Sequence, residues 1–141
     1  MTNNKIPEFS SDDAEMEAAI TNAKETFGEF LKAFFRPTEK QESFLVKVVF
    51  IEGEQSEHIW IADLAFSGQT PRGVIANEPA IPNLKFMQKV EFHPSQITDW
   101  MYIEDGYLVG GFTTKIIRER MNPSERNAFD TSAPYKFREA I

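Results

Sequence analysis

The chain of 141 residues is long enough for one domain with its own core, and its lack of cysteine excludes disulfides, thiolate metal sites and a cysteine nucleophile. Its formal net charge of −7 is unevenly spread. Residues 1–112 carry 18 acidic and nine basic residues, a balance of −9, whereas residues 113–141 carry four acidic and six basic residues, a balance of +2.

The acidic body argues against non-specific nucleic-acid binding, because it repels phosphate backbones. The longest strongly apolar stretch, residues 44–51, is too short to span a membrane and contains Lys47. The first residues lack the basic segment and apolar stretch of a secretory signal. We therefore expect a cytoplasmic protein that does not bind a membrane.

The N-terminal part predicts a disordered segment followed by a helix. Residues 1–9 are polar, contain Pro7 and show no hydrophobic period, whereas residues 10–13 ("SSDD") offer N-cap candidates. Apolar residues then recur at spacings of three and four: Met16, Ile20, Ala23, Phe27, Phe30 and Phe34. This stripe predicts one helix of about six turns that ends near Arg36–Pro37. It favours packing on a sheet over a partner-binding or dimer face.

The middle of the chain predicts five or six strands, because branched and aromatic residues recur in short segments. The segments are residues 43–52, 57–66, 71–77, 89–94, 97–103 and 107–111. In the first segment Phe44, Val46, Val48 and Phe50 share one face. Asp105–Gly106 is typical of a tight turn between the last two strands.

The C-terminal part predicts short helices. Thr113 is expected to cap the first, and Asn122 with Pro123 to begin the second. Gly110–Gly111 favours a bend that leads into the first helix over an anion-binding nest. Tyr135 and Phe137 could attach the last residues to the body.

The order of elements predicts an α+β fold. A long N-terminal helix packs on a curled antiparallel sheet or a small partly open β-barrel of five to six strands, and short C-terminal helices follow. We expect a disordered segment over residues 1–9, a single domain over residues 10–130 and a loosely ordered tail over residues 131–141.

Four motifs resemble those of the bacterial "domain of unknown function 2314" family. They are "EHIWI" (57–61), "GVIANEP" (73–79), "KVEFHPSQITDWMYIEDGYLVGGFT" (89–113) and "RERMNPSERNAFD" (118–130). The resemblance covers roughly residues 14–130, and the third motif is its most specific part. Met87–Gln88 departs from the Gly-Asp turn expected before "KVEF", which leaves the geometry of that turn open. The family is uncharacterised, so the resemblance implies no activity and no site residues.

His58 and Asp99 are the candidate catalytic residues. Alternation groups His58 with Trp60, Ala62, Leu64 and Phe66, and groups Asp99 with Ile97, Met101 and Ile103. His58 could be a general base oriented by Asp99, or a half-buried histidine that bonds to the backbone. A buried Asp99 needs a partner: Arg118, Arg120, His58, or backbone N–H groups at a turn, which we favour.

The aromatic residues Trp60, Trp100 and Tyr102 have two interpretations. They could line a recognition patch, with Asn77 and Glu78 in a neighbouring loop, or they could form the core of the domain. Asn77 could instead only bridge the backbone. The sequence leaves the choice between patch and core open.

We find no convergent catalytic set in the sequence, so the first hypothesis is a non-enzymatic interaction module. Its candidate binding residues are Trp60, Asn77, Glu78, Trp100, Tyr102 and Arg118. The acidic body favours a basic protein partner, and the helix stripe allows a homodimer. We expect no cofactor, and no metal because ligand spacing is lacking. The alternatives are a small hydrolase-like enzyme built on His58 and Asp99, and a nucleic-acid-binding small barrel, which the charge disfavours.

Overall fold

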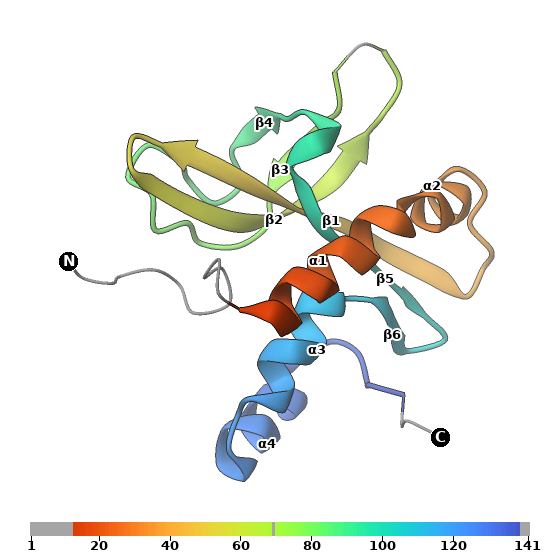
Figure 1. Cartoon of the computed structure of the whole chain (residues 1–141). Coiled ribbons are helices and arrows are strands. Elements are labelled where there is room, and N and C mark those ends of the chain that lie inside the picture. Colours follow the sequence, from red (N-terminus) through yellow and green to blue (C-terminus); the bar gives the residue numbers. More distant parts are fainter. Residues whose placement is uncertain (1–12, 69, 139–141) are drawn as a thin grey trace.

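One open antiparallel sheet runs through the molecule in the order β4–β3–β2–β1–β5–β6 (Figure 1). The computed structural model describes residues 13–68 and 70–138, and over these it contains six strands and four α-helices. The strands are β1 (Gln41–Glu52), β2 (Gln55–Ala65), β3 (Arg72–Ile75), β4 (Lys89–Glu91), β5 (Ile97–Glu104) and β6 (Tyr107–Gly110). The predicted α+β class is confirmed. The predicted disordered segment, residues 1–9, lies outside the described residues.

The β1–β2 hairpin forms the centre of the sheet, and β5 pairs with the other side of β1. Val46 lies opposite Ile61 of β2 and opposite Trp100 of β5. The predicted alternation along β1 is confirmed, because Phe44, Val46, Val48 and Phe50 all belong to or pack against the main core. This face of the sheet therefore carries the main core.

Helices α1 (Ala14–Glu25) and α2 (Phe27–Phe35) cover this face (Figure 1). Asp13 is the N-cap of α1, and its side chain accepts a hydrogen bond from the Met16 N–H at 3.1 Å. Four residues of the predicted stripe, Ala23, Phe27, Phe30 and Phe34, pack on the sheet as predicted, and Phe30 is completely buried. The stripe is therefore a packing face.

The prediction of one continuous helix is wrong, because the chain leaves helical geometry at Thr26 (φ −102°, ψ 7°). The Thr26 hydroxyl donates to the carbonyl of Asn22 at 2.7 Å, a bond that competes with helix formation. The indole Nε1 of Trp100 donates to the Ala23 carbonyl at 3.1 Å and to Thr26 Oγ1 at 3.2 Å. A side chain of the sheet thus holds the break between the two helices.

The main core is rich in aromatic rings. The Phe30 ring lies 5.7 Å from Trp100, and the Phe44 ring lies 4.9 Å from Tyr102, measured between centroids. Trp100 and Tyr102 are only 2% and 8% exposed. Each buried side chain of this size contributes about 1.5–3 kcal/mol to stability, so this cluster is the main apolar support of the fold.

A bulge in β5 changes the predicted faces of that strand. The pairing of β1 with β5 shifts between Lys47 and Val48, where Val48 lies opposite Ile97 and Lys47 opposite Asp99. The expected grouping of Ile97 with Asp99 is therefore wrong, because Ile97 belongs to the main core. Met101 and Ile103 belong to the separate cluster on the other face, as predicted.

A second bulge changes β2 in the same way. Its pairing with β3 shifts between Ala62 and Ala65, and Asp63 between them has a positive φ of 49°. Leu64 and Phe66 consequently pack against the main core and not on the face of His58, contrary to the prediction. An extra residue in a strand reverses the side-chain alternation beyond it.

The chain bends sharply after β6 and enters α3 (Phe112–Glu119). Gly110 and Gly111 have φ of 79° and 63°, and the Gly111 N–H donates to the Trp100 carbonyl at 2.7 Å. The interpretation of the glycine pair as a bend is confirmed. The predicted cap is wrong: Gly111 occupies the N-cap position, and Thr113 is buried in the first turn of the helix.

The other face of the sheet carries a smaller core of Met101, Ile103 and Leu108. Leu45, Trp60, Tyr135 and Phe137 pack against it. Residues 135–137, which we call the chain end, also pair with the edge of the sheet. The Leu108 N–H donates to the Lys136 carbonyl and the Lys136 N–H donates to the Gly106 carbonyl, both at 2.9 Å. Main-chain bonds and two aromatic rings therefore attach the chain end to β6.

Helix α4 (Pro123–Ser132) follows α3, and the chain then returns past α3 to β6 (Figure 1). Asn122 caps it as predicted, in a capping box with Glu125. Within the described residues, no helix is long and apolar enough to cross a bilayer.

The turn that the sequence left open, before β4, has an uncommon backbone. Met87 has φ of 74°, the left-handed region that favours glycine, and its side chain is 62% exposed. Its N–H donates to the Ile75 carbonyl at 2.9 Å. The turn thus keeps the geometry of a glycine turn without the glycine.

We predict that Gly110→Ala destabilises the fold by about 2–4 kcal/mol, because a Cβ would combine the positive φ with an overpacked contact. The Cβ would collide with the Trp100 carbonyl oxygen and would lie 2.5 Å from the Trp100 ring. Gly28→Ala in α2 is the matched control: its Cβ would meet nothing within 4 Å, and it should gain about 0.5–1 kcal/mol. Urea unfolding of both variants measures this, and equal stabilities would contradict the proposed role of the bend.

Candidate functional site

Asp99 is completely buried, and its carboxylate is saturated with hydrogen bonds. Oδ1 accepts from the backbone N–H of Trp100 at 2.8 Å and of Phe112 at 3.0 Å. Oδ2 accepts from the backbone N–H of Thr113 at 2.9 Å and from its hydroxyl at 2.5 Å. Phe112 and Thr113 begin α3, so the carboxylate occupies the helix end that attracts negative charge. The favoured partner, backbone N–H groups at a turn, is the one observed.

Lys47 supplies a second buried charge beside this carboxylate. It is 5% exposed, and its Nζ donates to Thr113 Oγ1 at 2.8 Å and lies 5.1 Å from the centroid of the Trp60 ring. The Thr113 hydroxyl therefore accepts from Lys47 and donates to Asp99. Burial raises the pKa of Asp99, while the Thr113 hydrogen bonds and the Lys47 charge oppose that rise. We call Lys47, Trp60, Asp99 and Thr113 the buried polar cluster.

His58 is half-buried beside this cluster. Its Nδ1 is hydrogen-bonded to Thr98 Oγ1 at 2.9 Å. Burial, together with the positive charges of Lys47 and Lys24, lowers the pKa of His58 to about 3. Such a ring is a weak general base at neutral pH, and the Asp99 oxygens that were expected to orient it hold α3 instead.

The buried polar groups serve the fold. Within residues 13–68 and 70–138, every buried side-chain nitrogen and oxygen has a hydrogen-bond partner. In the same residues, no three histidine or carboxylate side chains are grouped so as to hold a metal ion. The polar groups of the cluster therefore satisfy one another's hydrogen-bonding capacity.

The three predicted patch aromatics do not form one surface. Trp100 and Tyr102 lie in the main core, whereas Trp60 packs against the smaller core on the other face. The register explains this division, because Trp100 lies opposite Val46 and Trp60 lies opposite the next residue, Lys47. The structure thus places Trp100 and Tyr102 in the core.

The loop after β3 is tied to β2. Asn77 Oδ1 accepts from the Trp60 N–H, and the Ala76 N–H donates to the Trp60 carbonyl, both at 2.8 Å. Asn77 therefore bridges the backbone, which was its structural alternative. Glu78 is exposed beside it.

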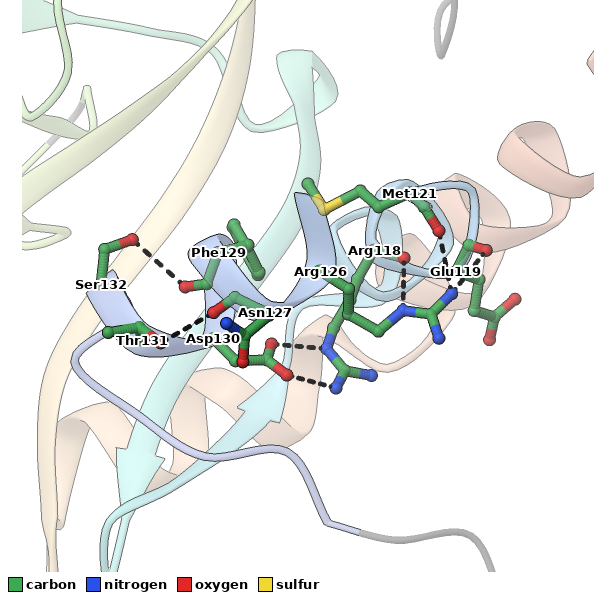
Figure 2. A network of polar contacts seen from close by, with 9 residues as sticks. All are labelled: Arg118, Glu119, Met121, Arg126, Asn127, Phe129, Asp130, Thr131 and Ser132. Atoms are coloured by element: carbon green, nitrogen blue, oxygen red, sulfur yellow. Dashed lines mark hydrogen bonds and ion pairs between the residues drawn. The ribbon is translucent and has the colours of Figure 1, made fainter. Parts of the chain in front are cut away.

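Arg118 belongs to a different region, between α3, α4 and the chain end. Its Nε and Nη2 donate to the two carboxylate oxygens of Asp130 at 2.7 and 2.6 Å (Figure 2). Its guanidinium lies 4.5 Å from the centroid of the Phe137 ring. Arg120 pairs with Asp13, so neither arginine is the partner of Asp99.

A hollow of about 580 Å³ lies beside Arg118. Its basic lining residues are Lys115, Arg118, Lys136 and Arg138, and its other lining residues are Glu119, Asp130, Tyr135 and Phe137. We call it the α3–α4 hollow. It combines positive charge with aromatic surface, a composition typical of binding sites.

The corner between α3 and α4 is held by Arg126. Its guanidinium donates to the carbonyls of Arg118 and Glu119, both at 3.3 Å, and of Met121 at 3.0 Å (Figure 2). The last carbonyls of a helix have no partner within it, so these bonds complete the end of α3. The wall of the hollow is therefore braced.

A second hollow of about 630 Å³ lies along β3 and β4. Its charged lining residues are Asp63, Arg72, Lys89 and Glu91. Two acids and two bases balance, so this hollow has no preference for ligands of one sign. The two hollows differ in this respect.

Of the residues that line the α3–α4 hollow, only Arg118 was predicted to bind a partner, whereas Tyr135 and Phe137 were expected only to attach the last residues to the body. Two signals were present: the +2 balance of residues 113–141 and the aromatic pair Tyr135 and Phe137. Neither signal indicates that these side chains converge, because the convergence depends on the return of the chain end to β6.

We predict that Asp99→Asn destabilises the fold by about 3–5 kcal/mol, because an amide cannot accept all four donors and leaves Lys47 without its balancing charge. Asp63→Asn, an exposed residue with left-handed backbone that asparagine tolerates, should change stability by no more than about 0.5 kcal/mol. Chemical denaturation measures both, and a loss below about 1 kcal/mol in Asp99→Asn would exclude the anchoring role.

We predict that stability falls from pH 7 to pH 5 through His58. The unfolded histidine binds a proton below its ordinary pKa of 6.5, whereas the folded ring stays neutral down to about pH 3, so acid favours unfolding. Partial exposure reduces the effect to roughly 1–2 kcal/mol at pH 5. His58→Gln should remove this part of the slope in unfolding free energies measured at several pH values, and an unchanged slope would contradict the prediction.

Comparison with known proteins places the chain in a family. It is 33% identical over 129 residues to "Putative ankyrin repeat protein" of Neisseria meningitidis serogroup B. The matched region covers 85% of this chain and 51% of that protein. It is 29% identical over 103 residues to "Uncharacterized protein YegJ" of Escherichia coli K12, covering 72% and 66%. This chain thus spans about half to two thirds of the length of these relatives.

No solved structure matches the chain significantly. A family model described as "Uncharacterized protein conserved in bacteria (DUF2314)" matches residues 13–137. This match includes all four motifs that carried the resemblance in the sequence. The chain therefore belongs to the DUF2314 family of bacterial proteins.

Proposed function

We propose that the chain is a non-enzymatic interaction module that binds a protein partner through the α3–α4 hollow. The observation that carries this proposal is the convergence of four basic and two aromatic side chains on a hollow of about 580 Å³. The hydrolase-like alternative lacks such support, since Asp99 has no exposed surface and holds α3.

The chemistry of the lining supports protein binding. Arginine and aromatic residues contribute most to protein interfaces, because they combine large apolar area with directed hydrogen bonds. The Tyr135 and Phe137 rings lie 5.5 Å apart in an edge-on arrangement, and Arg118 stacks on Phe137. The hollow therefore offers apolar contact and charge together.

The rigidity of the lining also supports this function. Arg118 is held by both oxygens of Asp130, and the chain end is held by the main-chain bonds of Lys136. Side chains that are already ordered lose less conformational entropy when a partner binds. A partner would meet a surface that needs little rearrangement.

One relative adds support. Its name describes an ankyrin repeat protein, and ankyrin repeats form extended concave binding surfaces. The match covers 51% of that protein, so the family region accompanies a long further segment there. An association with recognition repeats fits a role in protein interaction.

We predict that a photo-crosslinking amino acid in place of Glu119, an exposed lining residue of the hollow, captures a discrete protein adduct in living bacteria. The same group in place of Ile51, which is 74% exposed in β1 and remote in sequence from the hollow, is the control and should not give that adduct. Immunoblotting of irradiated cells measures this. Identical adduct patterns from both positions, or none from Glu119, would contradict the proposed function.

A further inference from the structure

We infer that the α3–α4 hollow binds an acidic peptide segment of the partner. This inference rests on the proposed function and adds the chemistry of the ligand. The lining carries four basic and two acidic residues, a local balance of +2, in a chain of net charge −7. The overall charge pointed to a basic partner, but the local charge where contact would occur has the opposite sign.

The internal ion pair does not cancel this local charge. Asp130 is engaged by Arg118 through two hydrogen bonds. Lys115, Lys136 and Arg138 form no ion pair with any of the described residues. They face one remaining carboxylate in the lining, that of Glu119, so an incoming carboxylate would find an excess of cations.

An aromatic ring holds one of these cations in place. Arg138 lies over the Tyr107 ring, 4.5 Å from its centroid. A guanidinium over a ring can still donate hydrogen bonds from its edge, where it can bind both oxygens of a carboxylate. The Tyr107 ring thus prepares Arg138 for a carboxylate.

A peptide fits this charge better than a nucleic acid. Duplex DNA carries one negative charge per about 1.7 Å, and a bound strand would extend beyond the hollow over an acidic body. A short segment with a few carboxylates can place its charge within the hollow alone. Its apolar side chains could contact Tyr135 and Phe137.

The test is fluorescence anisotropy of the full chain with a labelled ten-residue peptide of alternating Glu and Ala at low salt. The matched probes are the same peptide with Gln for Glu and a labelled oligodeoxythymidine. We expect binding of the Glu peptide only, with an affinity that falls as salt is raised, because exposed charges are screened.

The matched variants reverse two charges each. Lys136→Glu with Arg138→Glu alters the hollow, whereas Lys85→Glu with Lys89→Glu alters exposed residues outside it. The first pair should weaken binding at least about tenfold, a loss of about 1.4 kcal/mol, and the second pair less than about twofold. Circular dichroism of each variant establishes that it is folded.

Four results would overturn the inference: no binding of the Glu peptide, equal losses in both double variants, tighter binding of the oligonucleotide, or charge-dependent dimerisation through the hollow in the absence of peptide. An adduct at Glu119 without Glu-peptide binding would reject the acidic ligand and leave the interaction role standing. Absence of a crosslinked adduct at Glu119 in living bacteria would reject the interaction role itself.

Discussion

The position of α3, and of the α4 helix and chain end that follow it, depends on the hydrogen bonds between the Asp99 carboxylate and the first turn of α3. A carboxylate without solvent contact must be fully hydrogen-bonded, and its donors here come from Trp100, Phe112 and Thr113. The glycine pair bends the chain so that the N–H groups of α3 reach the carboxylate. Lys47 brings a compensating charge from the neighbouring strand through the Thr113 hydroxyl. One polar contact thus joins Lys47 of β1, Asp99 of β5 and Thr113 of α3, and the glycine pair makes it possible.

The direction of α3 then determines where the exposed charged residues lie. Arg126 closes the end of α3, Asp130 of α4 holds Arg118, and the chain end returns to β6 beside them. The polar residues consequently divide into two groups. The buried polar cluster holds the helix to the sheet, and the outer group lines the α3–α4 hollow on the side that solvent can reach. The first group stabilises the fold, and we propose that the second binds a partner.

Features that depend on neighbouring residues could be predicted from the sequence. The alternation along β1, the Asp105–Gly106 turn and the Asn122 cap are of this kind. The break at Thr26 could not be predicted, because the indole that holds it belongs to Trp100, 74 residues away. The bulges and the hollow depend on register and on helix direction, which no local pattern encodes. Trp60 and Trp100 lie on opposite faces only because β1 pairs them with Lys47 and Val46, respectively.

Native-state hydrogen exchange at the amides of Phe112 and Thr113 tests the anchoring of α3 most directly. First-turn amides of a helix have no intrahelical partner and ordinarily exchange quickly. If Asp99 holds them, both should exchange only by global unfolding, with protection equal to that of the Val48 amide in the central strand. Exchange as fast as that of Ser124, in the first turn of α4, would show that the carboxylate does not anchor the helix and would contradict the account.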